Sequence, residues 1–467
     1  MGRVRAAPAA LAALGLVAVA AAAPAGPPGQ WSRLGKPSAG PAEPALARTP
    51  DGVLHVVSPA GAGTELWEAR VAPDGHRLAL ARLPGRWRAL SSPELGVAAD
   101  GTLQLVVGAE RSSDPSDPRS GIVLATASPG APWQLADAPL VPGTGMATSD
   151  VGAATLPDGT PVVAWARNGS LRYRFGTTGA RELALPDCCA RRPDLAVDAI
   201  TGRVVLAWVS LARGSGGVVA QAIGADGPAG RRLYAPGSAG LGRRDSVATE
   251  SRTAVAARIG AQGVYVAYGH VARVAKPRRF VGIRLWRVGA PAPAVDLRAP
   301  DIGSVTLAAA PQGRLWLAWQ RAGRLFAART NRAATRVGAV RELPPPPRTG
   351  GVERMQGEGS AGPLDLVVDA RGRGGLTVWH TRVLPGLTLR VRASTEAGGL
   401  ARYRFAVLDA GDPVANAVVR VGAQSLVTGA SGSVVLETSD RPGSATATKA
   451  GYAPAVVRVP APARASG

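Results

Sequence analysis

The sequence predicts an all-β protein: a β-propeller of about seven four-stranded blades, followed by a small C-terminal β-sandwich. One observation is a turn of the Asp-Gly kind that recurs along the chain between short alternating apolar runs. Its spacing is roughly 50 residues, which is typical of propeller blades built from short strands. The composition agrees, because glycine and proline number 60 and 40 while aromatic residues make up only 4% of the chain.

Each repeat begins with a predicted β-hairpin whose turn ends in glycine. The best-defined copy has strands at Leu195–Ala199 and Arg203–Val209 around Thr201-Gly202. Alternating runs on both sides of such a tight turn are typical of a hairpin. The other turns are Asp51-Gly52, Asp100-Gly101, Asp158-Gly159, Gln262-Gly263, Gln312-Gly313 and Arg371-Gly372. The seven turns predict seven blades, and six is the alternative because two of the intervals are irregular.

The repeat around Thr201-Gly202 also indicates the order of strands within a blade. We expect an innermost strand at Leu195–Val197, then Val204–Trp208 and Val218–Ile223, and an outermost strand at Arg231–Tyr234. The second strand ends with a large ring in five repeats and with valine in the first two. In chain order these residues are Val57, Val107, Trp165, Trp208, Tyr268, Trp319 and Trp379. The rings are predicted to fill the wedge between adjacent blades.

The last repeat supplies only three strands before the composition changes. We expect them near Leu364–Val368, Leu376–His380 and Thr388–Ala393. The segment Gln30–Lys36 precedes the first repeat and is similar in sequence to the expected outermost strand Arg86–Ser92. We therefore expect this N-terminal strand to complete the last blade. Closure of the ring in this way removes the two open sheet edges.

The N-terminus has the pattern of a signal peptide, which we assign to residues 1–25. Arg3 and Arg5 precede an apolar run from Ala9 to Ala22 that ends in small residues. This run is shorter than the roughly 20 apolar residues of a membrane span, and no second run of spanning length follows. We expect a secreted protein, extracellular or periplasmic, with no transmembrane segment after removal of the signal.

A different strand pattern begins after residues 397–399. Four short runs with new turns are expected to be strands, at Tyr403–Leu408, Ala417–Val421, Val434–Glu437 and Ala445–Lys449. With the motif Lys449-Ala450-Gly451-Tyr452, this segment resembles the carboxypeptidase regulatory-like or bacterial Ig-like domain. We place the propeller at residues 30–396 and the β-sandwich at 400–462. The resemblance implies that the second unit is a spacer or an adhesive appendage.

The blades resemble those of secreted sialidase-like (Asp-box) propellers. The resemblance is carried by the stretch PDLAVDAITGRVVLAWV and by the turn Ser128-Pro-Gly-Ala-Pro-Trp133, which has neither the Asp nor the Thr of an Asp-box. It implies three arginines that bind a substrate carboxylate and a tyrosine nucleophile activated by a glutamate. The family's Arg-Ile-Pro motif has one similar tripeptide here, Arg82-Leu83-Pro84, expected near an outer strand.

The ligand-binding candidates are Arg192, Arg252, Arg354 and Glu250, and no catalytic residue is assigned. Arg192 and Arg252 precede innermost strands, and Glu250 is close to Arg252 in sequence. They belong to the face opposite the hairpin turns, where the long loops are expected at Glu110–Ser120, Leu140–Asp150, Ala235–Arg252, His270–Phe280 and Pro344–Pro363. Binding residues concentrate on long loops of rigid scaffolds. The leading hypothesis is a non-catalytic protein that binds a glycan, a cell-wall polymer or a surface protein on this face; the alternative is a sialidase-type exo-glycoside hydrolase.

The cysteines, histidines and arginines bear on three other kinds of site: a disulfide, a metal or cofactor site, and a nucleic-acid-binding surface. Cys188 and Cys189 are the only cysteines, and after export they form a vicinal disulfide, an intermolecular bridge or free thiols; we predict the vicinal disulfide. The four histidines, His55, His76, His270 and His380, have no metal-ligand spacing with one another or with the cysteines, so we expect no metal and no cofactor. The net charge of +22 comes from scattered arginines without interleaved aromatic residues, so no nucleic-acid partner is expected.

Overall fold

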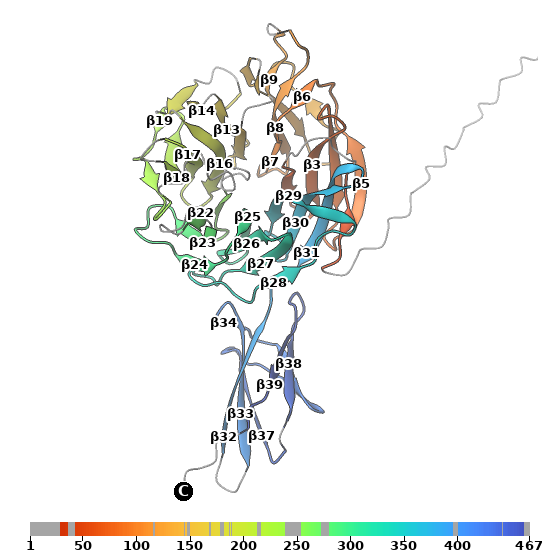
Figure 1. The fold of residues 1–467 in the computed structure, drawn as a ribbon, viewed down its shortest axis with the longest axis vertical. Coiled ribbons are helices and arrows are strands. Elements are labelled where there is room, and N and C mark those ends of the chain that lie inside the picture. Colours follow the sequence, from red (N-terminus) through yellow and green to blue (C-terminus); the bar gives the residue numbers. More distant parts are fainter. Residues whose placement is uncertain are drawn as a thin grey trace, which may run out of the picture.

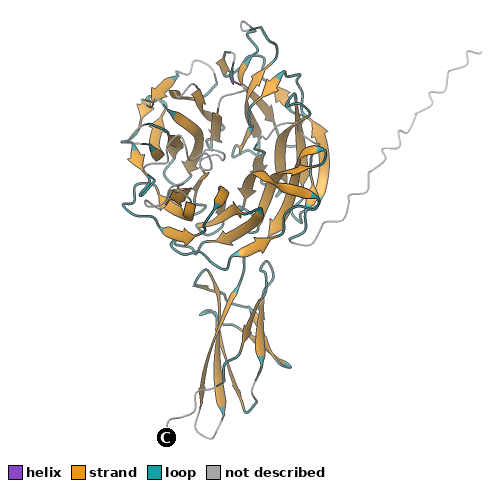
Figure 2. Ribbon diagram, viewed as in Figure 1, coloured by secondary structure: helices purple, strands orange, loops and turns teal. Residues whose placement is uncertain are grey.

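The computed structural model describes residues 29–35, 43–114, 117–143, 145–146, 150–167, 170–177, 182–185, 187, 189–212, 216–238, 254–271, 280–395, 400–440 and 442–461. Within these ranges the elements are β-strands without an α-helix, and the strands pair antiparallel in nine sheets (Figure 2). The predicted all-β class is therefore confirmed. No helix in these ranges is long and apolar enough to cross a membrane. Seven of the sheets lie side by side around a common axis (Figure 1).

The first four of these sheets follow the chain in order. The first sheet contains β2 (Ala45–Arg48), β3 (Leu54–Ala60), β4 (Glu65–Val71) and β5 (Arg77–Arg82). The second contains β7 (Glu94–Val97), β8 (Leu103–Glu110), β9 (Gly121–Ala127) and β10 (Gln134–Leu135), with β6 (Ala89–Leu90) beside β8 and β11 (Val141–Pro142) beside β9. The third contains β12 (Asp150–Thr155), β13 (Pro161–Arg167), β14 (Ser170–Phe175) and β15 (Leu183–Leu185). The fourth contains β16 (Ala190–Asp198), β17 (Arg203–Ser210), β18 (Gly217–Gly224), β19 (Gly227–Pro228) and β20 (Leu233–Tyr234).

The next three sheets continue around the axis. The fifth contains β21 (Ala254–Ala257), β22 (Val264–Val271), β23 (Phe280–Arg287) and β24 (Val295–Arg298). The sixth contains β25 (Ile302–Ala310), β26 (Arg314–Arg321), β27 (Arg324–Arg329) and β28 (Arg341–Leu343). The seventh contains β29 (Thr349–Glu358), β30 (Leu364–Gly372), β31 (Gly375–Val383) and β1 (Ser32–Arg33). The first strands of neighbouring sheets contact each other in sequence from β2 to β29, and β29 in turn contacts β2.

The predicted hairpin turns join the first and second strands of the first six sheets, as expected. In three of them the turn aspartate accepts a hydrogen bond from the backbone N–H two residues later: Asp51 from Val53 at 3.2 Å, and Asp100 from Thr102 and Asp158 from Thr160 at 2.9 Å each. The following glycine has φ near +85°, a region that favours glycine. This local chemistry explains why the turns could be recognised in the sequence.

The predicted rings lie on second strands in four sheets, where they are buried. They are Trp165, Trp208, Tyr268 and Trp319 on β13, β17, β22 and β26. Each lies in a hydrophobic core shared with the preceding sheet; Trp208, for example, shares one with Leu171 and Tyr173 of β14. Burial of large rings between sheets removes much apolar surface from water and stabilises the contact between neighbours.

The seventh sheet differs from its prediction by one strand. Its first strand is β29, within the segment Pro344–Pro363 that was expected to be a loop, so β30 is the second strand and Trp379 lies on the third. The expected turn residues Arg371-Gly372 end β30, and the turn to β31 is at residues 373–374. The sequence of β29, TGGVERMQGE, is rich in glycine and charge and has no clear alternation of apolar residues. The expected N-terminal strand is confirmed: β1 pairs with β31, with Ser32 opposite His380.

The C-terminal strands form two further sheets, which lie beneath the ring of sheets in Figure 1. One contains β32 (Thr388–Thr395), β33 (Ala401–Asp409), β34 (Asp412–Pro413) and β37 (Ser433–Thr438), and the other contains β36 (Gln424–Val427), β35 (Val418–Val421), β38 (Ser444–Thr448) and β39 (Ala455–Arg458). They share one core that includes Tyr403, Phe405, Val419 and Ala447. The prediction that Thr388–Ala393 belongs to the seventh sheet is wrong, because β32 pairs with β33.

Candidate functional site

The predicted ligand-binding residues lie partly within the described chain. Arg192 is on β16 at a bulge, with φ of 52°, and its backbone N–H donates to Asp150 Oδ2 at 3.0 Å. Its Nε is 3.9 Å from Asp150 Oδ1. Arg354 is on β29, where its Nη1 donates to the carbonyl of Glu353 at 3.1 Å. Arg252 and Glu250 lie outside the described residues. The structure therefore places two of the four, on the first strands of the fourth and seventh sheets.

The cysteine pair precedes β16 as predicted, and Cys188 lies outside the described residues, so the vicinal disulfide stays a prediction. The neighbouring Asp187 is buried and organises this turn. Its carboxylate accepts hydrogen bonds from Cys189 N at 2.9 Å, from Trp208 Nε1 at 2.8 Å and from Ser210 Oγ at 3.2 Å. The turn is thus tied to the ring that fills the wedge between the third and fourth sheets.

A large cavity lies between the first and second sheets, on the side of the hairpin turns. Its volume is about 1070 Å³, and it is lined by the turns at Asp51-Gly52 and Asp100-Gly101, by β3, β4 and β5, and by residues 127–133. We call it the inter-sheet pocket. Ligand pockets commonly have volumes up to about 1,000 Å³. This position differs from the expected one, because the long loops belong to the opposite face.

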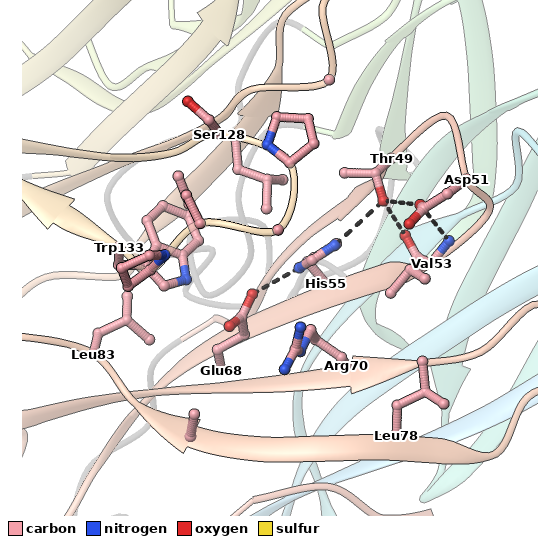
Figure 3. A pocket seen from close by; sticks show the side chains of 18 of the residues that line it. Thr49, Asp51, Val53, His55, Glu68, Arg70, Leu78, Leu83, Ser128 and Trp133 are labelled. Carbon is pink, nitrogen blue, oxygen red and sulfur yellow. Dashed lines mark hydrogen bonds and ion pairs between the residues drawn. The ribbon is translucent and has the colours of Figure 1, made fainter.

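The first sheet contributes a buried polar pair to the inter-sheet pocket. His55 on β3 and Glu68 on β4 are 9% and 7% exposed, and His55 Nδ1 is 2.7 Å from Glu68 Oε1. Both side chains lie on the same face of the sheet, because Val57, two residues after His55, pairs with Glu68. Arg70 and Leu78 extend this wall toward solvent. Figure 3 shows the pair in the middle of the pocket.

A chain of hydrogen bonds connects this pair to the hairpin turn. Thr49 Oγ1 is 3.3 Å from His55 Nε2, 2.5 Å from Asp51 Oδ1 and 3.1 Å from the carbonyl of Val53 (Figure 3). Threonine has a single hydroxyl hydrogen, and the Asp51 carboxylate is its nearest acceptor. The hydrogen bond from Thr49 lowers the pKa of Asp51. The threonine is therefore part of the turn, and this arrangement orients the imidazole rather than activating a nucleophile.

The second sheet supplies the opposite wall from the turn between β9 and β10. This is the turn Ser128–Trp133, whose sequence resembles an Asp-box. The Trp133 ring packs against a core that includes Leu103 and Ala127, and it also lines the pocket. In Figure 3 Trp133 and Leu83 lie at one end of the pocket, facing the His55–Glu68 pair. Leu83 and Pro84 belong to the tripeptide Arg82-Leu83-Pro84, which begins at the last residue of β5 and thus lies near an outer strand, as predicted.

The cavity occurs at the junction where both second strands carry valine in place of a ring. Val57 and Val107 share a core with Trp87, a ring supplied by the connection between β5 and β7. The other described junctions with a ring on the second strand have it buried in the wedge. Smaller side chains leave more of this wedge unfilled by the strands. The substitution of valine for a ring was visible in the sequence, but no site was predicted from it.

Among the described residues there is no group of three or more His, Cys, Asp and Glu side chains that could hold a metal ion. No family model matches the chain, and no curated protein is similar to it in sequence. The function therefore has to be argued from the inter-sheet pocket itself.

Proposed function

We propose that the chain is a secreted, non-catalytic β-propeller that binds a glycan in the inter-sheet pocket. In this proposal the seven sheets are blades, β1 is the outermost strand of the last blade, and the C-terminal sheets form a β-sandwich. The sequential contacts of the first strands and the contact between β29 and β2 support a closed ring. The apolar run that follows Arg3 and Arg5 supports secretion.

The observation that carries the proposal is the pairing of an indole ring with fixed polar groups in one cavity. Trp133 offers an apolar surface, while the His55–Glu68 pair, Arg82 and Asp100 offer hydrogen-bonding groups. Sugars have apolar C–H faces and hydroxyl edges, so such a lining is complementary to them. A cavity also favours a glycan over a surface protein, because protein partners use broad surfaces of about 800 Å² on each side.

The proposal is tested in two steps. The purified chain is first screened on an array of neutral and acidic glycans, and the hexasaccharides that bind are then titrated by calorimetry. We expect Trp133→Ala and Glu68→Gln each to weaken binding at least about tenfold, a loss of about 1.4 kcal/mol. Tyr234→Ala is the matched control, since Tyr234 is an aromatic ring on an outer strand, 48% exposed and outside the pocket. Unchanged affinity in both pocket variants would contradict this site.

The sialidase alternative has a separate test. Hydrolysis of a fluorogenic sialoside by the purified chain, lost in Arg192→Ala, would overturn the non-catalytic proposal. The absence of release at high protein concentration is the expected outcome. In the described residues Arg192 is engaged by Asp150, and Arg354 contacts its neighbour's carbonyl, so neither position by itself supports a shared carboxylate site.

A further inference from the structure

A second cavity adjoins the inter-sheet pocket and is lined almost entirely by arginine. Its volume is about 510 Å³, and its lining residues are Arg82, Gly85, Arg86, Arg111 and Arg119. Arg82 and Gly85 also line the inter-sheet pocket, so the two cavities meet at these residues. Arg82 ends β5, and Arg111 and Arg119 lie between β8 and β9. A groove thus continues from the hairpin side, between two sheets, to the loop that follows β8.

The positive charge in this second cavity is only partly balanced. Arg82 Nη1 is 3.2 Å from Glu65 and Arg119 Nε is 3.1 Å from Asp117. Within the described chain no acidic side chain pairs with Arg86 or Arg111, and the buried Arg111 Nε has no hydrogen-bond partner. A buried guanidinium nitrogen without an acceptor is costly unless a ligand supplies one. The cavity therefore has two guanidinium groups available for an anion.

The Arg111 guanidinium is held in place by packing. Its Cζ is 4.7 Å from the centre of the Trp87 ring, which is 6% exposed and fixed in the core between the first and second sheets. Trp87 in turn packs against Gly85, where an added Cβ would be 2.5 Å from Trp87 Cζ2. Stacked arginine loses less freedom when it binds a planar or tetrahedral anion. Gly85 and Trp87 are thus positioning residues for Arg111.

We propose that the ligand is an acidic glycan, with a neutral part of the sugar chain in the inter-sheet pocket and a carboxylate or sulfate group in the arginine cavity. This inference rests on the proposed glycan-binding function. Guanidinium groups bind such anions through paired hydrogen bonds. A nucleic acid fits less well, because Trp87 is buried beneath Arg111 and offers no face for a base to stack on.

The test compares each acidic hexasaccharide with a neutral counterpart of the same sugar sequence. The carboxylate arm uses oligogalacturonate and its methyl ester. The sulfate arm uses a heparin-derived hexasaccharide and a form that is desulfated, N-acetylated and reduced at its uronate carboxyl groups. We expect the acidic form of at least one pair to bind about tenfold more tightly at low salt. This preference should decrease as salt rises, because exposed charges are screened.

Two variants locate the effect. Arg86→Gln changes an exposed residue and Arg111→Gln a stacked one, and each is expected to remove most of the acidic preference while binding of the neutral form is retained. Arg324→Gln is the matched control, because Arg324 is 66% exposed on the sixth sheet. Arg86→Gln keeps the test valid if Arg111→Gln disturbs the packing of Trp87.

The outcomes separate the two proposals. Equal binding of both members of each pair, unaffected by either variant, would overturn the acidic-glycan inference and leave the inter-sheet pocket in place. Failure of all four hexasaccharides and of the array would overturn the glycan-binding function and this inference with it. If an RNA hexanucleotide binds more tightly than every hexasaccharide, and Arg86→Gln removes this binding, the ligand is a nucleic acid and the acidic-glycan inference is overturned.

Discussion

Arg48 on β2 and Asp365 on β30 form an ion pair although 317 positions separate them in the chain. Arg48 Nε also binds Glu358 Oε2 at 2.7 Å. The Asp365 side chain is fully buried and accepts hydrogen bonds from His380 Nε2 at 2.8 Å and Arg382 Nε at 3.1 Å. One carboxylate therefore links the last of the seven sheets to the first, at the same junction where β29 contacts β2.

Replacement of Asp365 by asparagine should strongly destabilise the protein. The variant leaves His380 and Arg382 without their counter-charge and removes one of the two carboxylates that pair with Arg48. Breaking a buried ion pair costs about 3–5 kcal/mol. Urea unfolding should show this loss in the free energy of unfolding. Asp296→Asn is the control, because its pair with Arg284 has a carboxylate that is 53% exposed, and about 1 kcal/mol or less is expected. A loss below about 1 kcal/mol in Asp365→Asn would contradict this role.

Asp365 should also make stability depend on pH in the acid range. Burial works against ionisation of its carboxyl group, but the hydrogen bond from His380 and the charges of His380, Arg382 and Arg48 outweigh it, so the pKa lies below the usual 3.8. A carboxyl group whose pKa is lower in the folded state stabilises the protein above its unfolded pKa. That stabilisation is lost as the pH falls through the folded pKa. Urea titrations from pH 5 to pH 2 should show a steeper decline for the wild type than for Asp365→Asn, and parallel curves would reject the assignment.

The fold could be predicted where residues adjacent in sequence specify a turn or a strand. Turns such as Asp100-Gly101 are specified by one side chain and one glycine, so they were found together with the strands that they join. The first strand of the seventh sheet was missed, because β29 is held by its position between β25, β30 and β2 rather than by its own alternation. Its omission shifted every expected strand of that sheet by one place.

The site was less predictable because it depends on register between strands. His55 and Glu68 are 13 residues apart and meet across a β-hairpin, a spacing that a search for metal-ligand motifs does not cover. The lengths of the predicted loops favoured a binding site on the face opposite the hairpin turns. Arg82-Leu83-Pro84 and Ser128–Trp133 were compared with a family's motifs, and both line the pocket although neither completes its motif. The valines at positions 57 and 107 depart from the ring pattern at this junction, but no cavity was predicted from them.

The contact between the sixth sheet and the C-terminal sheets should depend on Asp409. This buried carboxylate pairs with both Arg314 and Arg329, with a distance of 3.2 Å to Arg314 Nη1. Burial lowers the pKa of Arg314, although Asp409 opposes that effect. In Asp409→Ala we expect the interface to loosen, so that limited proteolysis separates the C-terminal unit at much lower protease concentration than in the wild type. Glu437→Gln, at a carboxylate that is 55% exposed, is the control. An unchanged cleavage pattern in Asp409→Ala would show that other contacts hold the interface.

Gly85 should be required both for packing and for the preference for an acidic ligand. Its φ is +116°, and an added Cβ would be 2.5 Å from Trp87 Cζ2, so alanine is strained by its backbone and displaces the ring. We expect Gly85→Ala to lower the free energy of unfolding by about 1–3 kcal/mol. Gly289→Ala separates the two causes, because Gly289 also has positive φ, at +93°, but has no atom within 4 Å of an added Cβ. A larger loss in Gly85→Ala than in Gly289→Ala therefore measures the displacement of Trp87. Since Trp87 supports Arg111, the same variant should bind the acidic hexasaccharides no better than their neutral counterparts, and a retained preference would show that Arg111 does not need this support.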